Sequence, residues 1–190
     1  LRYYLIKEVS LGNDGKISNE NFESCINSDL ANNYGNFCQR VLSFAEKNCK
    51  NLVPANIEFN SQDLKVLNSF VDNLDNVRSF IDNQQLNGYI KFIVDRIFEA
   101  NKYFNDESPW SKKDNIKRLN TIVYVSLEII RKISILLFPI IPETAKKALK
   151  SLAIDVKLTN IDSLKNHNVL KAQTNLINPG ILFKKIKING

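Results

Sequence analysis

The segment SDLANNYGNFCQRVLSFAEK, residues 28–47, decides the fold because its apolar residues recur at helical spacing. At about 100° per residue, one stripe collects Leu30, Tyr34, Phe37, Val41, Phe44 and Ala45. Asn36 and Arg40 lie four residues apart, so both point from one flank of this stripe. Gly35 costs about 1 kcal/mol relative to alanine in a helix, which predicts close approach by a neighbouring helix. The segment therefore predicts an amphipathic helix with one buried face.

Similar periodicity predicts helices through most of the chain. A short helix in residues 1–9 precedes the turn sequence LGNDGK (11–16), and Ser18 is the expected N-cap of a helix that runs to about residue 50. Further helices are expected at 62–82 with Ser61 as cap, at 84–104, from Ser111 or Asp114 to 138, and from Pro142 to 152.

The last forty residues are less regular. Residues 161–167 predict a single helical turn, and residues 178–188 predict a turn followed by an extended or strand-like segment. The expected fold class is thus all-α, an antiparallel bundle of five main helices with a short irregular or extended C-terminal tail.

Charge is divided unevenly along the 190 residues. Residues 1–110 hold 11 Lys and Arg against 15 Asp and Glu, whereas residues 111–190 hold 15 against 5. A basic half is typical of proteins that bind a polyanion, either a nucleic acid or a membrane surface. An ordinary solvated, lysine-rich surface would give the same excess.

Sequence motifs for catalysis, disulfides and metals are missing. Cys25, Cys38 and Cys49 form no C-x-x-C pair, and the only histidine, His167, sits in a polar segment that predicts a solvated loop. We therefore expect no catalytic residue, no metal site and a reducing, cytoplasmic environment. The longest apolar run, residues 133–141, is far shorter than the roughly 20 residues of a membrane span, so no membrane is expected.

The only tryptophan, Trp110, lies in the polar segment YFNDESPWSKKDNIKR, residues 103–118. It could fill a gap between two helices, or it could present a flat face to a planar ligand. On the earlier helix, Asn36 and Arg40 pair an amide with a guanidinium, a combination suited to the edges of nucleic-acid bases. A routine polar helix face would look the same.

Three segments taken in order resemble the C-terminal part of methionyl-tRNA synthetases. They are LRYYLIKEVSLGNDGKIS (1–18), INSDLANNYGNFCQRVL (26–42), and EANKYFNDESPWSKK (99–113) with the later ETAKKAL (143–149). The G-N-x-x-x-R and P-W motifs carry most of the specificity, and ILFKKI (181–186) is similar to the apolar-basic strand that often ends family members. The resemblance implies the end of a stem-contact region at 1–20, an anticodon-binding helical bundle at 21–153, and a tail at 154–190. That tail would pack on the bundle or on a catalytic domain.

The resemblance also implies roles for particular residues. Asn36, Arg40 and Trp110 correspond to the family's readers of the CAU anticodon, and Pro109 would shape the tryptophan loop. The basic residues that follow are candidates for contacts with the RNA backbone: Lys112, Lys113, Lys117 and Arg118.

The resemblance has further consequences for the whole protein. The expected partner is tRNA(Met), and the chain, which lacks Met and begins like the middle of a protein, would be one piece of a monomeric enzyme. A catalytic domain upstream would bind methionine, ATP and Mg²⁺, so no cofactor is expected in this piece. Two alternatives stay open: the bundle of a related class I synthetase for Leu, Ile, Val or Cys, and a helical module for protein interaction or membrane surfaces.

Overall fold

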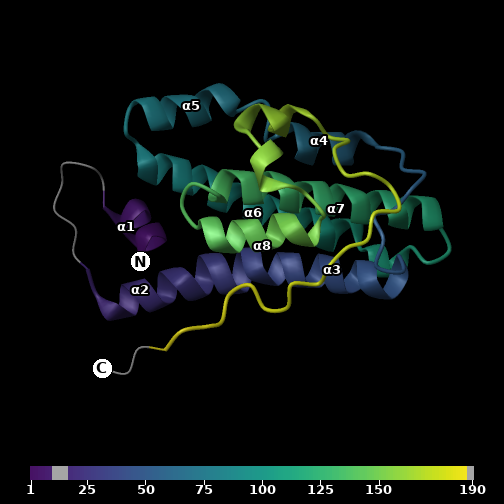
Figure 1. Ribbon diagram of the computed structural model, residues 1–190, viewed down its shortest axis with the longest axis horizontal. Coiled ribbons are helices and arrows are strands. Elements are labelled where there is room, and N and C mark those ends of the chain that lie inside the picture. The colour runs from purple at the N-terminus through teal and green to yellow at the C-terminus, as the bar shows by residue number, and fades with distance from the viewer. Residues whose placement is uncertain (10–16, 188–190) are drawn as a thin grey trace.

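The computed structural model describes residues 1–9 and 17–187, which form a helical bundle with an extended tail (Figure 1). The helices are α1 (Arg2–Glu8), α2 (Asn19–Cys25), the π-helix η1 (Ile26–Gly35), α3 (Asn36–Asn48), α4 (Ser61–Asn68), α5 (Leu74–Asp82), α6 (Leu86–Glu107), the 3₁₀ turn η2 (Pro109–Ser111), α7 (Ile116–Leu137), α8 (Pro142–Ser151), and the 3₁₀ turns η3 (Val156–Leu158) and η4 (Ile161–Lys165). The predicted all-α class is confirmed. The turn predicted at residues 11–16 lies outside the described residues.

Helix α7 is the centre of the bundle. It packs against α3, α4, α6 and α8, and every residue from Thr121 to Leu137 is buried. Burial on all sides explains why its sequence is apolar almost throughout rather than on one stripe. None of the helices in the described part of the chain combines the length and apolar character needed to cross a membrane.

Several predicted helix ends are confirmed and two are wrong. The Ser18 Oγ atom accepts a hydrogen bond from the Asn21 amide at 3.1 Å, and Pro142 opens α8. Ser61 is not a cap, because Asn60 and Asp63 form a capping box one residue earlier. Helix α7 begins after Asn115, whose side chain caps it, rather than after Ser111 or Asp114.

The helix predicted at 62–82 is two helices. Helix α4 ends at Asn68 and α5 begins at Leu74, with a turn between them. In the turn the Ser69 hydroxyl donates to the carbonyl of Val66, and the Asn73 amide donates to the carbonyl of Ser69. Polar side chains that bond to nearby backbone in this way compete with the helix. The apolar period continues across the break because Phe70 and Leu74 are both buried.

The first long helix contains a wider segment that periodicity did not predict. Residues Ile26–Gly35 are π-helical, between the α-helical turns of α2 and α3. Within this segment Asp29 is buried, where it accepts from the Tyr3 hydroxyl at 2.8 Å and pairs with Lys7 at 2.9 Å. These contacts fix α1 to the bundle. The predicted apolar stripe is nevertheless confirmed, since all six of its residues are buried or half-buried.

Buried charges on α7 hold η4 and the chain that follows it. Glu128 accepts hydrogen bonds from the amides of Val169 and Leu170 at 2.8 and 2.9 Å, and pairs with Arg131 at 2.7 Å. Lys132 donates to the carbonyl oxygens of Leu164 and Asn166. Because every one of these charges has polar partners, the burial is tolerated and the loop is fixed to the bundle.

The C-terminal tail returns along the bundle and runs beside η1 and α3 (Figure 1). Its first part joins two helix ends: the Leu176 amide donates to the carbonyl of Asn51, and the Ile177 amide to that of Ser151. The tail is extended, as predicted, but among residues 1–9 and 17–187 no strand forms. Only an isolated bridge between Leu52 and Asn175 occurs, because a single extended segment has no second strand to pair with.

Candidate nucleic-acid interface

Phe104, near the end of α6, is the centre of the candidate site. Its ring is 2% exposed and meets Phe37, Phe44 and Trp110 edge to face, at centroid distances of 6.3, 6.1 and 5.9 Å. The Arg40 guanidinium carbon lies 5.3 Å from the centre of the same ring, which is within cation–π range. Two side chains that are 70 positions apart in the sequence, Arg40 and Trp110, are therefore placed against one buried aromatic ring.

The loop that carries Trp110 is tightly fixed. Helix α6 is followed by its C-cap Ser108, which is in the left-handed region (φ 46°, ψ 63°), and the buried Pro109 then opens a 3₁₀ turn. The Ser108 hydroxyl donates to the carbonyl of Asn105 at 2.6 Å, and the Ser111 hydroxyl donates to that of Ser108 at 2.8 Å. Trp110 is 45% exposed. The indole thus packs on Phe104 and also faces solvent. It therefore combines the two roles considered from the sequence, a filler between helices and a face open to a planar ligand.

Arg40 is held in place by a second contact. Its Nη2 atom donates to the Asn105 side-chain oxygen at 2.6 Å. A guanidinium has five N–H donors in a planar fork, and this bond uses one of them. The ring of Phe104 and the amide of Asn105 together restrict the guanidinium to one orientation. An oriented, half-buried guanidinium is suited to donating to a base edge.

Asn36 is the first residue of α3, one turn before Arg40, and its side chain is exposed. It does not contact Phe104; it lines a groove between the helix and the C-terminal tail. Gly35 precedes it at a close approach, but the approaching element is the tail and not the expected helix. A β-carbon at Gly35 would lie 3.4 Å from the Phe183 ring and 3.0 Å from the carbonyl oxygen of Leu30.

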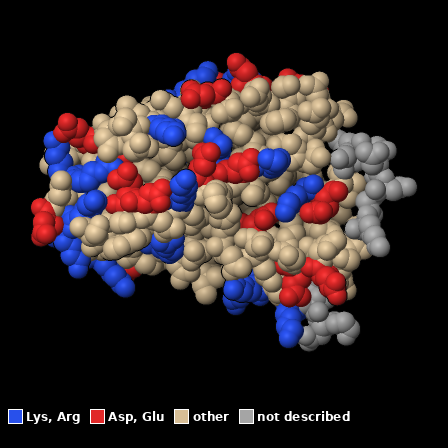
Figure 2. Space-filling view, turned by 180° about the vertical axis from the view of Figure 1, so that it is seen from behind, with Lys and Arg blue, Asp and Glu red and all other residues tan. Residues whose placement is uncertain are grey.

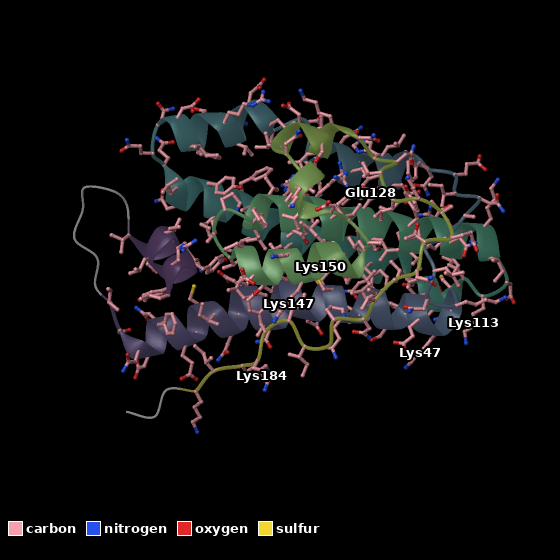
Figure 3. The ribbon with its side chains drawn as sticks, in the orientation of Figure 1. Lys47, Lys113, Glu128, Lys147, Lys150 and Lys184 are labelled. Atoms are coloured by element: carbon pink, nitrogen blue, oxygen red, sulfur yellow. The ribbon has the colours of Figure 1, made fainter. Side chains whose placement is uncertain are left out.

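The four basic candidates beyond Trp110 fall into different environments. Lys113 is exposed beside the α6–α7 turn (Figure 3), and Lys112 is half-buried. Lys117 forms an exposed ion pair with Glu58. Arg118 is half-buried.

Arg118 belongs to a partly buried network rather than to the surface. It donates to Asp63 at 2.6 and 3.0 Å and to Glu107 at 2.6 Å, while the Tyr103 hydroxyl donates to Asp63 at 2.5 Å. Burial alone would lower the pKa of Arg118, but the hydrogen bonds to Asp63 and Glu107 raise it above its ordinary value. Burial and the contact with Asp63 also raise the pKa of Tyr103. With its fork occupied by two carboxylates, Arg118 joins α4, α6 and α7 and is not positioned to bind a phosphate.

Surface charge is mixed rather than gathered in one large patch. Figure 2 shows acidic and basic side chains interspersed on the rear face, with basic ones predominating at the end formed by the α6–α7 turn. On the opposite face, Figure 3 labels Lys147 and Lys150 on α8 and Lys184 on the tail. In the described part of the chain, no group of three or more His, Cys, Asp or Glu side chains is arranged to hold a metal ion.

Sequence reasoning missed Phe104, Asn105 and the place of the tail beside α3. Phe104 and Asn105 belong to the segment that contains Trp110. From helical spacing alone, Phe104 is one more core residue and Asn105 is one more polar surface residue. Their partners Phe37, Phe44 and Arg40 belong to another helix, and no local spacing predicts which ring meets which. The tail itself was predicted, but nothing in ILFKKI indicates that Lys184 and Lys185 lie beside Asn36.

Comparison with known proteins gives a consistent result. Residues 53–189 match the family described as the anticodon binding domain of methionyl tRNA ligase, and residues 1–42 match class I tRNA synthetases of the methionine type. Methionine–tRNA ligase of Thermotoga maritima is 33% identical over 98% of this chain and 30% of its own length, and that of Brucella suis is 38% identical over 81% and 30%. This chain thus spans about a third of these relatives.

Solved structures of a methionyl-tRNA synthetase have the same fold as this chain. The apo form of Mycobacterium tuberculosis methionyl-tRNA synthetase superposes with a TM-score of 0.91 at 32% identity, covering 99% of this chain and 38% of that one. The complex of the same enzyme with methionyl-adenylate gives a TM-score of 0.88 at 34% identity, covering 96% and 36%.

Proposed function

The chain belongs to the methionyl-tRNA synthetase family, and from that premise we propose that its bundle reads the CAU anticodon of tRNA(Met) through Trp110, Arg40 and Asn36. The observation that carries the proposal is the packing of Arg40 and Trp110 on Phe104, which sets a half-exposed indole beside an oriented guanidinium. Proteins that read single-stranded RNA use aromatic faces and arginine in this way. The match to the methionine family favours this specificity over a related synthetase for Leu, Ile, Val or Cys.

Each residue has a distinct role in this proposal. The exposed face of Trp110 stacks on an unpaired anticodon base, and Pro109 fixes the turn that presents it. Arg40 donates to a base edge, and Asn36, with a donor and an acceptor on one amide, can pair with another. Lys112 and Lys113 are close enough in sequence to Trp110 to attract neighbouring phosphates. Lys117 contributes less because it is paired with Glu58, and Arg118 serves the interior.

The activity of the whole protein is a further part of the proposal. By analogy with its relatives it would attach methionine to tRNA(Met), with ATP and Mg²⁺, in a monomeric cytoplasmic enzyme. We assign the end of the stem-contact region to residues 1–20, the anticodon-binding bundle to 21–153, and the tail to 154–190. None of these residues is assigned a catalytic role, and the part played by the chain is identification of the tRNA.

Anticodon stem-loops test the proposal directly. We expect tighter binding to a CAU stem-loop than to the same stem with the three bases permuted, and a steep loss of affinity as salt rises. Arg40→Ala should reduce the preference for CAU, whereas Arg78→Ala, which removes an arginine paired with Asp162 at the surface, should leave it unchanged. Equal binding of both stem-loops by the unmodified protein would leave only nonspecific attraction to phosphates.

A further inference from the structure

The groove that Asn36 lines has the composition of a nucleotide site. It measures about 590 Å³ and lies between the start of α3 and the C-terminal tail. Three exposed amides form its helical side, Asn32, Asn36 and Gln39, and the tail adds Lys184 and Lys185. The volume is within the range of small-ligand sites. Amides can pair with base edges, and lysines attract phosphates.

The tail is held against the helix by specific contacts, so the two lysines are positioned and not merely nearby. The Asn27 side chain donates to the Ile186 carbonyl at 2.8 Å and accepts from the Ile186 amide at 2.9 Å. The Phe183 ring packs over Gly35 and meets the Tyr34 ring edge to face at 6.2 Å. Lys184 and Lys185 lie between these two anchors, and both side chains are exposed.

The two lysines of the groove differ from other lysines on the described surface. Within residues 1–9 and 17–187, neither Lys184 nor Lys185 has an acidic side chain within ion-pair distance. Other surface lysines, such as Lys91, Lys117 and Lys165, do have such partners. Two adjacent cations that lack an acidic partner among the described residues, beside exposed amides, favour an anionic ligand that also has hydrogen-bonding edges.

We propose that this groove binds the nucleotide next to the base read at Trp110 and Arg40, with Lys184 and Lys185 on its phosphate and Asn32 and Gln39 at its base edge. The rise of an α-helix places Asn36 about 6 Å from Arg40 along α3, so the groove and the aromatic site are neighbours. The C-terminal tail is thereby part of the RNA-binding surface. This inference rests on the proposed anticodon-binding function and adds a second subsite to it.

Lysine variants test the phosphate contacts. The double variant Lys184→Gln with Lys185→Gln should make the slope of log K against log salt less steep by about 1.4. Each lysine accounts for about 0.7 of this change, the value for one phosphate contact with single-stranded RNA. That corresponds to roughly tenfold weaker binding near 0.15 M salt, for CAU and permuted loops alike. The matched control, Lys65→Gln with Lys102→Gln, removes the same charge from exposed positions on α4 and α6 and should leave the slope unchanged.

Two further variants distinguish the placement of the tail from direct contact with the base. Asn27→Ala releases the anchor at Ile186 without removing a charge; it should make the tail sensitive to protease and reproduce most of the lysine effect. Gln39→Ala should weaken binding to the cognate loop more than to loops altered at the neighbouring base, because it removes a base contact rather than a phosphate contact.

The outcomes distinguish this inference from the function on which it rests. If the lysine pair behaves like its control while Trp110→Ala still weakens binding, the groove is not a subsite and the anticodon site stands. If neither the lysine pair nor Trp110→Ala and Arg40→Ala change binding, the anticodon site and the groove both fail.

Discussion

Replacement of Trp110 by alanine distinguishes RNA stacking from packing, and the structure sets the size of both effects. Truncation of a fully buried aromatic residue costs about 3–5 kcal/mol of unfolding free energy. Trp110 is 45% exposed, so we expect about half of that, roughly 1.5–2.5 kcal/mol. At about 2–4 °C per kcal/mol for a chain of this size, the melting temperature should fall by roughly 3–10 °C. Loss of one base stack should cost about 1–3 kcal/mol of binding, which is about a five- to 150-fold weaker affinity.

The assay uses the fact that Trp110 is the only tryptophan. Its fluorescence in the unmodified protein should be quenched by the CAU stem-loop, since the base stacks on the indole itself. Affinity of the variant is measured with labelled RNA well below its melting temperature, where it is fully folded. Phe98→Ala is the control, because Phe98 is an aromatic residue on α6 that is 65% exposed, and Trp110→Phe should restore part of the binding.

The stacking role would be refuted by a folded Trp110→Ala protein that binds the CAU stem-loop with unchanged affinity, together with unmodified protein whose tryptophan emission ignores the RNA. A fall in melting temperature with normal binding would assign the indole to packing alone. The Phe98→Ala control guards against a general effect of removing surface aromatic area.

The other predictions concern the supports of the site. Arg118→Met leaves the fully buried Asp63 without its guanidinium partner and should lower the unfolding free energy by about 3–5 kcal/mol, while the folded protein binds labelled RNA with unchanged affinity. Gly35→Ala should displace Phe183 and cost about 1–3 kcal/mol, seen as an earlier melting transition with protease cleavage of the tail; an unchanged protein would contradict the close approach. Burial and the adjacent Arg131 lower the pKa of Lys132 to about 7, against the opposing effect of Glu128, so the unfolded chain binds more protons above that pH. Denaturation midpoints should therefore rise between pH 7 and about pH 8.5, below the range where the buried thiols titrate, and Lys132→Met should abolish the rise.

The helices and their apolar faces could be predicted from the sequence, whereas several of their ends could not. The Ser18 cap and the start of α8 at Pro142 follow from local chemistry. The break between α4 and α5 does not, because the apolar period passes through it unchanged while Ser69 and Asn73 redirect the backbone hydrogen bonds. The π-helical segment is similar: it holds Asp29, whose contact with Tyr3 of α1 joins distant parts of the chain.

The sequence by itself determined the all-α class, the flank shared by Asn36 and Arg40, and the membership of the family, because these depend on residues close together along the chain. Only the tertiary structure decided which cations face solvent. Arg40 and Arg118 both lie on predicted helices, yet one lies over Phe104 at the surface and the other between Asp63 and Glu107. Only the fold likewise brought the C-terminal lysines beside Asn36, through Asn27 and Gly35. The physical reason is that helical spacing is set by local backbone geometry, whereas burial and ion pairing depend on neighbours supplied by other segments.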